Sequence, residues 1–186
     1  MMYRIVFCLG GALALAACNR GPQVNLKNAS GQQVAQAVSK SAVGSGQYVI
    51  QPGEWITRTS IVERSYPGMS PEFQQQMQRA MAAQQPNALN RCVTTEEARK
   101  PNEDFFAGQD GSCRFAHFTM GKGRIDVHMV CQQPRGTQTS NISGTYSPTS
   151  YSMEISTLTS GGEGSGALTK MHVEARRIGD CAGKGS

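Results

Sequence analysis

No run of apolar residues in this sequence is long enough to cross a membrane as a helix. The longest apolar segment, Ile5–Ala17, holds 13 residues, whereas a membrane-spanning helix needs about 20. This length fits the apolar region of a secretory signal peptide, which has about 7–15 residues and follows a short basic stretch, here Arg4. The sequence therefore disfavours a membrane-spanning helix and favours an export signal.

Motifs that carry catalysis or hold a cofactor are also missing. The pattern H-E-x-x-H does not occur around His117, His128 or His172, and neither a G-x-S-x-G elbow nor a phosphate-binding G-x-x-x-x-G-K-[ST] loop is present. In a hairpin centred on Lys122, His117 lies opposite Val127 and on the other face from His128. We therefore expect no catalytic, cofactor-binding or metal site, and no enzyme activity.

A concentrated basic stripe, which nucleic-acid binding would need, is missing too. The chain has 18 basic and 13 acidic residues, and its formal charge of +5 falls to +4 once Arg4 is removed with the signal. The densest basic piece is Arg176-Arg177, with Glu174 and Asp180 close by in sequence. We expect no nucleic-acid partner; weak attraction to anionic lipid headgroups stays open.

What the N-terminus does contain is a cleavage signal. The segment Leu15-Ala16-Ala17-Cys18 resembles the bacterial lipobox, in which the cysteine is acylated and the chain is cut before it. Residues 1–17 are thus predicted to be a lipoprotein signal peptide, and Cys18 to be the lipidated residue. By the same resemblance, Asn19 favours the outer membrane, with the protein facing the periplasm. An ordinary secretory signal is the alternative.

The remaining cysteines indicate disulfides. Of six cysteines, Cys8 leaves with the signal and Cys18 carries the lipid. An even number of the others in an exported chain indicates two disulfides, and their gaps are too long for zinc pairs such as C-x2-C. These four are Cys92, Cys113, Cys131 and Cys181.

The segment GKG selects among the three connectivities that four cysteines allow. It centres a hairpin turn on Lys122, so that Cys113 lies opposite Cys131 on the mainly apolar face. Cys92 is then left to pair with Cys181. Pairing sequence neighbours, 92 with 113 and 131 with 181, is the alternative.

The clearest helix is predicted over residues 71–84. Ser70 can cap its free amides, and Pro71 suits the first helical position. Apolar residues recur at helical spacing and are expected to pack on a sheet. They are Phe73, Met77, Ala80 and Met81.

Most of the remaining chain predicts strands, over residues 55–64 and again from Cys113 onward. In the last of them, Met171, Val173 and Ala175 alternate with polar residues, as in a half-buried strand. Short loops between neighbouring strands imply an antiparallel meander. The predicted fold class is mainly β (α+β): an antiparallel β-meander, curled or a partial barrel, with one principal amphipathic helix packed on it.

Residues 18–47 are predicted to be an N-terminal tether with room for a short helix, and residues 48–186 to be a single disulfide-stabilised, β-rich domain. The short helix rests on Ser30 and Gln33, which form a capping-box pattern. Val34 and Val38 then share one face.

Several short motifs together resemble a bacterial family known as domain of unknown function 3617. The matching pieces, over residues 48–181, are PGEW, PGM, RCVTTEEA, the later Cys113 and Cys131, and RRIGDC. The resemblance implies an exported, β-rich domain with four cysteines. It implies no known activity and assigns no functional residues.

Three functional classes follow. The first is a lipid-anchored, non-catalytic envelope protein that meets membrane lipid through acylated Cys18 and acts by contacts with envelope components. The alternative is a periplasmic module that binds a small hydrophobic ligand, since Gly53-Glu54-Trp55 is similar to the opening of lipocalin-like barrels. An enzyme is the third class, and a cleft with converging acids or histidines would favour it.

Overall fold

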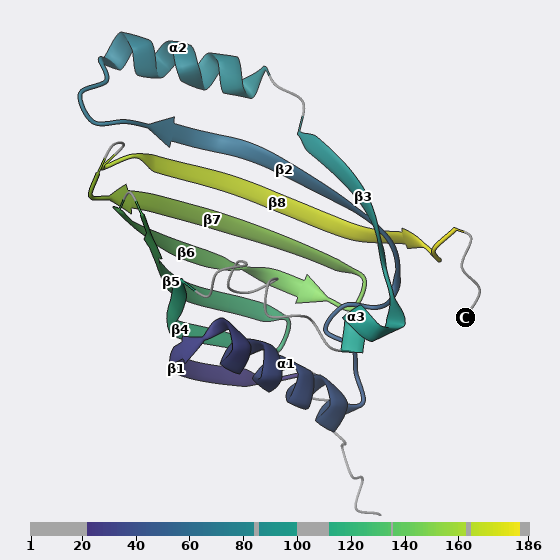
Figure 1. Ribbon diagram of the computed structural model, residues 1–186. Coiled ribbons are helices and arrows are strands. Elements are labelled where there is room, and N and C mark those ends of the chain that lie inside the picture. Colours follow the sequence, from purple (N-terminus) through teal and green to yellow (C-terminus); the bar gives the residue numbers. More distant parts are fainter. Residues whose placement is uncertain (1–21, 84–85, 100–111, 135, 163–164, 183–186) are drawn as a thin grey trace, which may run out of the picture.

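The computed structural model describes residues 22–83, 86–99, 112–134, 136–162 and 165–182. The predicted signal peptide and Cys18 lie outside these residues. Eight strands form an antiparallel sheet in the order β1-β4-β5-β6-β7-β8-β2-β3 (Figure 1). The strands are β1 Val24–Ser30, β2 Gly53–Ser65, β3 Asn87–Val93, β4 Cys113–Gly121, β5 Arg124–Gln133, β6 Gly136–Ser147, β7 Ser150–Ser160 and β8 Leu168–Gly179; the helices are α1 Gly31–Ser45, α2 Pro71–Ala82 and α3 Thr95–Arg99.

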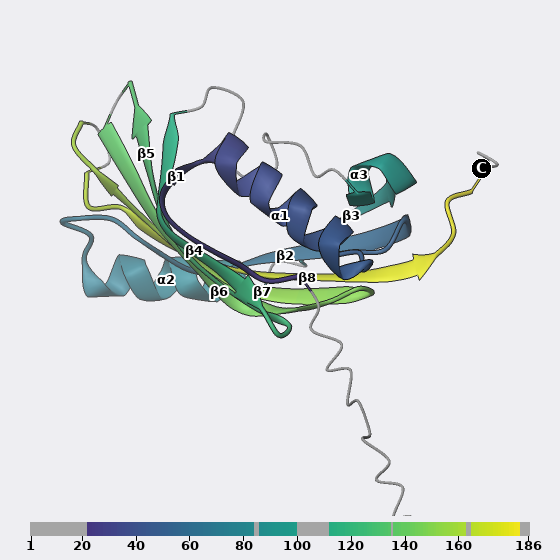
Figure 2. The same cartoon turned by 90° about the horizontal axis from the view of Figure 1, so that it is seen from below.

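The sheet is curled and does not close. Its edge strands, β1 and β3, stand at opposite ends of the strand order, and the sheet curves around α1 and α3 (Figure 2). We call the side that holds α1 and α3 the concave face, and the other side the convex face. Strands β4 to β8 are consecutive in both sequence and space, as short connections favour. The predicted fold class, a mainly β antiparallel meander in a curled sheet, is confirmed.

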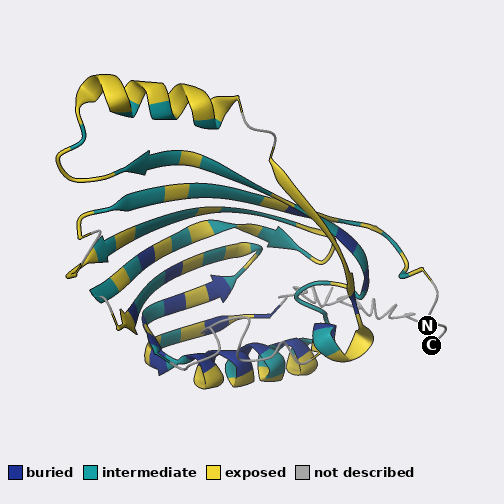
Figure 3. Cartoon of the chain, turned by 45° about the horizontal axis from the view of Figure 1, so that its top comes forward, coloured by how far each residue is buried: buried dark blue, intermediate teal, exposed yellow. Residues whose placement is uncertain are grey.

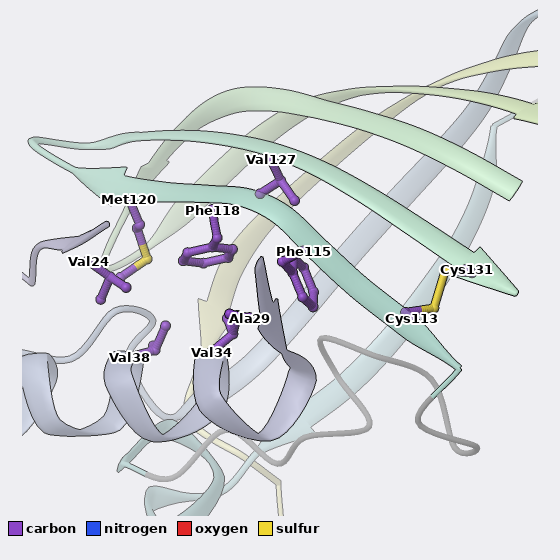
Figure 4. Close-up of a cluster of buried hydrophobic side chains, with 10 residues drawn as sticks. All are labelled: Val24, Ala29, Val34, Val38, Cys113, Phe115, Phe118, Met120, Val127 and Cys131. Carbon is purple, nitrogen blue, oxygen red and sulfur yellow. A yellow bond between two sulfur atoms is a disulfide. The ribbon is translucent and has the colours of Figure 1, made fainter. Parts of the chain in front are cut away.

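Residues 22–47 belong to the folded domain, because β1 and α1 contribute side chains to the core. Ser30 caps α1 through the predicted capping box: its Oγ accepts from the backbone amide of Gln33, and the Gln33 side chain accepts from the amide of Ser30. Val34 and Val38 are fully buried against Phe115 and Phe118 (Figure 4). The predicted boundary at residue 48 therefore does not divide a tether from a domain.

The helix predicted over residues 71–84 is present as α2, but it does not fill the core. Ser70 accepts from the amide of Phe73, as predicted. No described residue of α2 is buried, and Phe73 is 57% exposed. The helix packs against β2, whose pairing with β3 ends at Thr59. It thus lies beside a free sheet edge, a position that hinders edge-to-edge pairing, while α1 is the helix of the core (Figures 1 and 3).

The register of the β4–β5 hairpin differs from the prediction beyond Phe115. A bulge at Ala116 interrupts the pairing, and His117 lies opposite His128 rather than Val127. An extra residue in one strand changes which side chains face each side from that point on. Phe118, opposite Val127, is therefore the core residue. The expectation that His117 and His128 lie on opposite faces is wrong.

Both disulfides are those that the hairpin argument selects. Cys113 bonds to Cys131, with a Cα–Cα distance of 3.9 Å. Cys92 bonds to Cys181, with a Cα–Cα distance of 5.5 Å, and this bond ties the end of β3 to the segment that follows β8. The second bond closes a loop with a sequence separation of 89, so it restricts almost half of the 186-residue chain in the unfolded state.

Candidate functional site

One row of apolar side chains crosses four strands of the concave face. Ile142 pairs with Ile155, Ile155 with Met171, and Met171 with Ile61. Directly opposed residues point to the same side of a sheet, and Ile142 packs against the buried cluster around α1. All four side chains, which we call the apolar row, therefore lie on the concave face.

The positions next to the apolar row on this face of β6, β7 and β8 carry no charge, and on β2 the charged position beyond Ile61 is Arg64, opposite Thr169. Met153 pairs with Val173 beside the apolar row. On the other side of the row, the hydroxyls of Ser140 and Thr157 lie 2.9 Å apart and satisfy each other. Further positions on this face are Thr57, Thr59 and Thr169. The lining is thus apolar with scattered hydroxyls, which suits a ligand without charge along its length.

An aromatic pair at the α3 end of the concave face combines buried Trp55 with half-buried Tyr151. Trp55 is 3% exposed and stacks on Tyr151, with ring centroids 6.1 Å apart. Its indole Nε1 donates to the carbonyl of Gln51 at 2.9 Å. Ala98 of α3 and Ala175 of β8 are buried in the same cluster. Since its one polar atom is satisfied, Trp55 acts here as a fixed apolar wall.

The apolar row lies between two buried clusters but is itself only half-buried. Figure 3 shows buried residues gathered on α1, β1, β4 and β5, and intermediate burial over much of β7, β8 and β2. Helix α1 packs against β1 and β4 at one end of the sheet. The apolar row therefore keeps surface that a ligand can cover.

Most of the charged and titratable groups of these strands lie on the convex face. Asp126 lies 2.5 Å from Nε2 of His117, and Asn141 Oδ1 lies 2.7 Å from Nδ1 of His128. Each of these two histidines contacts one polar side chain on the neighbouring strand, so both contacts tie adjacent strands together. Among the residues that the structure describes, no three His, Cys, Asp or Glu side chains form a group that could hold a metal ion.

The third histidine, His172, lies between two carboxylates. Its Nε2 is 3.0 Å from Glu174 and its Nδ1 is 2.5 Å from Glu154. Hydrogen bonds to Glu174 and Glu154 raise the pKa of His172 above its usual value. Both ring nitrogens of His172 are engaged, so the imidazole links Glu154 of β7 to Glu174 of β8.

Three of the quoted sequence motifs meet at the Trp55 end of the sheet. Gly53 has φ +140°, and a Cβ there would lie 2.5 Å from Nε of Arg177; that nitrogen donates to the carbonyl of Pro52 at 2.8 Å. Nearby, Glu97 accepts from the amide of Thr94, which with Arg91 lowers the pKa of Glu97. These motifs hold the end of the concave face in place.

Only part of this site can be predicted from the sequence. The alternation of Met171, Val173 and Ala175 predicts one apolar strand face, and the structure places it on the concave side. That Ile61 and Ile142 join the same row depends on pairings between distant segments, for which the sequence holds no local signal.

Fold and site together define a disulfide-bonded, mainly β protein with an open, apolar concave sheet face. Its two disulfides indicate an oxidising compartment outside the cytoplasm. Among the described residues, no helix has the length and apolar character to span a membrane.

The family comparison adds an identity to this class. The model of the family described as "Protein of unknown function (DUF3617)" matches residues 50–181, and the chain belongs to this family. No curated protein and no solved structure matches the chain. The matched region starts after β1 and α1, so it leaves out the helix that packs in the core.

Proposed function

We propose that this chain is a lipid-anchored, non-catalytic protein of the cell envelope that binds a fatty acyl chain on its concave face. The observation that supports this most is the apolar row, Ile142–Ile155–Met171–Ile61, which is half-buried between the α1 cluster and Trp55. A soluble domain that leaves such a row open gains stability when an apolar ligand covers it.

The dimensions and lining suit an extended apolar chain. Neighbouring strands lie about 4.8 Å apart, so the row of four strands spans roughly 14 Å across the sheet. Met153 and Met171 border each other diagonally on β7 and β8, and unbranched thioether side chains adapt to ligands of different shape. Apart from Arg64 at the end of β2, the lining is uncharged, so a bound chain that lies along the apolar row desolvates no ion.

The lipobox supports the anchor. Cys18 is four residues before Pro22, the first residue of the described fold. Four extended residues reach at most about 14 Å, so an acylated Cys18 would hold the sheet close to its lipid source. Replacing Cys18 by Ser in the native host tests this: the variant should move from the detergent phase to the aqueous phase. Unchanged partitioning would refute the anchor.

The ligand site is tested with the exported chain carrying Cys18→Ser and with brominated stearic acid as the probe. Bromine quenches indole fluorescence at short range, and Trp55 is the single tryptophan. We expect saturable quenching of Trp55 by the brominated acid and competition by unlabelled stearic acid. No quenching, or quenching that does not saturate, would overturn the proposal.

Two neighbouring substitutions make the test specific for the concave face. Ile155→Asp places a charge in the apolar row, and Ser156→Asp places the same charge on the convex side of the same strand. We expect Ile155→Asp to weaken binding at least about tenfold, because the charge must be desolvated, and Ser156→Asp to leave it unchanged. Equal loss in both variants would contradict binding on this face.

Contact with an envelope protein is a second candidate function. It is favoured by exposed apolar side chains on α2 and on the edge strand β3. Phe73 of α2 is 57% exposed and Leu89 of β3 is 67% exposed. Native mass spectrometry of protein extracted gently from the envelope separates the candidates. A retained lipid mass supports acyl binding, whereas a stoichiometric protein partner that is lost with Phe73→Ser supports protein contact.

A further inference from the structure

A shallow pocket of about 350 Å³ opens where four strands lie side by side near the β6–β7 turn. Its lining combines two arginines, one glutamate and several hydroxyls with a few apolar groups. The polar lining residues are Arg58, Arg176, Glu174, Thr145, Ser147, Ser150 and Ser152. We call this the Arg58–Arg176 pocket.

The register places these polar groups on the convex face, away from the apolar row. Arg176 pairs with both Ser150 and Ile56, and Arg58 pairs with Glu174. Each occupies the position next to a concave-face residue, as the alternation of a strand requires. The charged groups of the pocket therefore lie on the side away from the proposed acyl site, while Tyr146, Tyr151 and Ala175 of the concave face complete its lining.

The charge of the pocket favours an anion. Neither Arg58 nor Arg176 forms an ion pair with a residue that the structure describes. Glu174, the only acid in the lining, already contacts His172. Arg124 pairs with Thr145 at the rim and adds a third positive charge there. Guanidinium groups and hydroxyls are the donors that phosphate oxygens prefer.

The pocket also lies at the end of the sheet where the predicted anchor enters. The phenol of Tyr146, a lining residue, donates to the carbonyl of Pro22 at 3.3 Å. Burial raises the pKa of Tyr146, so the phenol keeps the proton that it donates. Cys18 is only four residues before Pro22, which limits its distance from the pocket end of the fold.

We propose that the Arg58–Arg176 pocket binds the phosphate of an anionic phospholipid headgroup in the membrane that holds Cys18. The orientation of the pocket toward the membrane rests on the lipid anchor of the proposed function, but its affinity for the headgroup does not. Anchor and pocket together fix two points of the domain, so the open concave face has a set orientation to the bilayer.

The test uses the exported chain with Cys18→Ser, so that no acyl anchor contributes. Binding is measured by co-sedimentation with vesicles of one part phosphatidylglycerol to two parts phosphatidylcholine, and with vesicles of phosphatidylcholine alone. We expect binding to the anionic vesicles only. Each basic residue near an anionic leaflet contributes about a factor of five, so Arg58→Gln with Arg176→Gln should weaken binding by about 25-fold.

A matched double variant removes the same charge from the other end of the sheet. Arg64 lies near the C-terminal end of β2 and Arg114 near the N-terminal end of β4. In both strands this is the end that lies far from the β6–β7 turn. Arg64→Gln with Arg114→Gln should change vesicle binding by less than about threefold. Equal loss in the two double variants would overturn the pocket, because general surface charge would then account for binding.

Two further outcomes would also overturn the proposal. Equal binding to both kinds of vesicle would show that the headgroup charge is not recognised. Displacement from vesicles by millimolar glycerol phosphate, at constant ionic strength, would show that the pocket takes a free phosphate ester instead of a membrane. Both results are independent of Trp55 quenching and of detergent partitioning of the acylated chain, so a failure here is distinguishable from a failure of the proposed function.

Discussion

Cys113 lies directly opposite Cys131, although the turn of their hairpin does not by itself put them there. Gly121 pairs with Arg124 across the two-residue turn, and regular pairing from that point would set Cys113 opposite residue 132. The bulge at Ala116 adds one residue to β4 and restores the alignment of the cysteines. The same bulge decides which side chains of β4 face α1.

The first prediction concerns this change of face. Phe118→Ala should lower the free energy of unfolding by about 3–5 kcal/mol, because Phe118 is buried beside Phe115 and its loss leaves a cavity. Thr119→Ala, at an exposed position of the same strand, should change it by less than about 0.5 kcal/mol. Urea unfolding measures both, and a larger effect at Thr119 would refute the observed register.

The second prediction tests whether α1 belongs to the folded domain. Val38→Asp should destabilise the chain by about 3–5 kcal/mol, because it puts an unpaired charge in the core. Val43→Asp, also on α1 but 72% exposed, should have little effect. Thermal unfolding of the two variants decides the matter. If Val38→Asp were neutral, the segment before residue 48 would be a tether after all.

The third prediction concerns the turn before β2. Gly53→Ala should cost about 1–3 kcal/mol, because φ is +140° and the added Cβ would meet Arg177 and the carbonyl of Gly179. Gly44→Ala, in α1 with nothing within 4 Å of the added Cβ, should instead add about 0.5–1 kcal/mol of stability. Chemical denaturation should therefore show a lower free energy of unfolding for Gly53→Ala and a higher one for Gly44→Ala. Destabilisation by both substitutions would contradict the prediction.

The fourth prediction is a pH dependence that originates at His172. Glu174 and Glu154 raise the pKa of His172 in the folded chain, so the folded state binds this proton more tightly than the unfolded state. The stabilisation is fully present below the unfolded pKa of about 6.5 and is lost as the pH rises through the higher, folded pKa. The stability advantage over His172→Gln should therefore be larger at pH 6 than at pH 9.

A double variant provides the control for that pH dependence. With Glu154→Gln and Glu174→Gln, the two partners of His172 lose their charge, and replacing His172 should then give the same difference in unfolding free energy at both pH values. A pH-dependent difference that persists in this background would place its origin elsewhere.

Much of the local structure of this chain can be predicted from interactions between residues that are close in sequence. The Ser30 and Ser70 caps and the alternation along β8 follow from hydrogen bonding and side-chain direction within a few residues. The disulfide pairing also follows from one hairpin, even though two departures from the assumed register offset each other there: the turn centre lies half a residue later, and Ala116 bulges.

The sequence by itself thus determined β2 and the strands from Cys113 onward, the helix caps, the cysteine pairs and the absence of a long apolar span, but not the edge strands β1 and β3. Only the tertiary structure decided that α1 fills the core while α2 lies at an edge, and that Ile61 joins Ile142 in one row through β7 and β8. The reason is physical: periodicity shows that a segment has an apolar face, but the partner of that face is set by pairings between residues far apart in the chain.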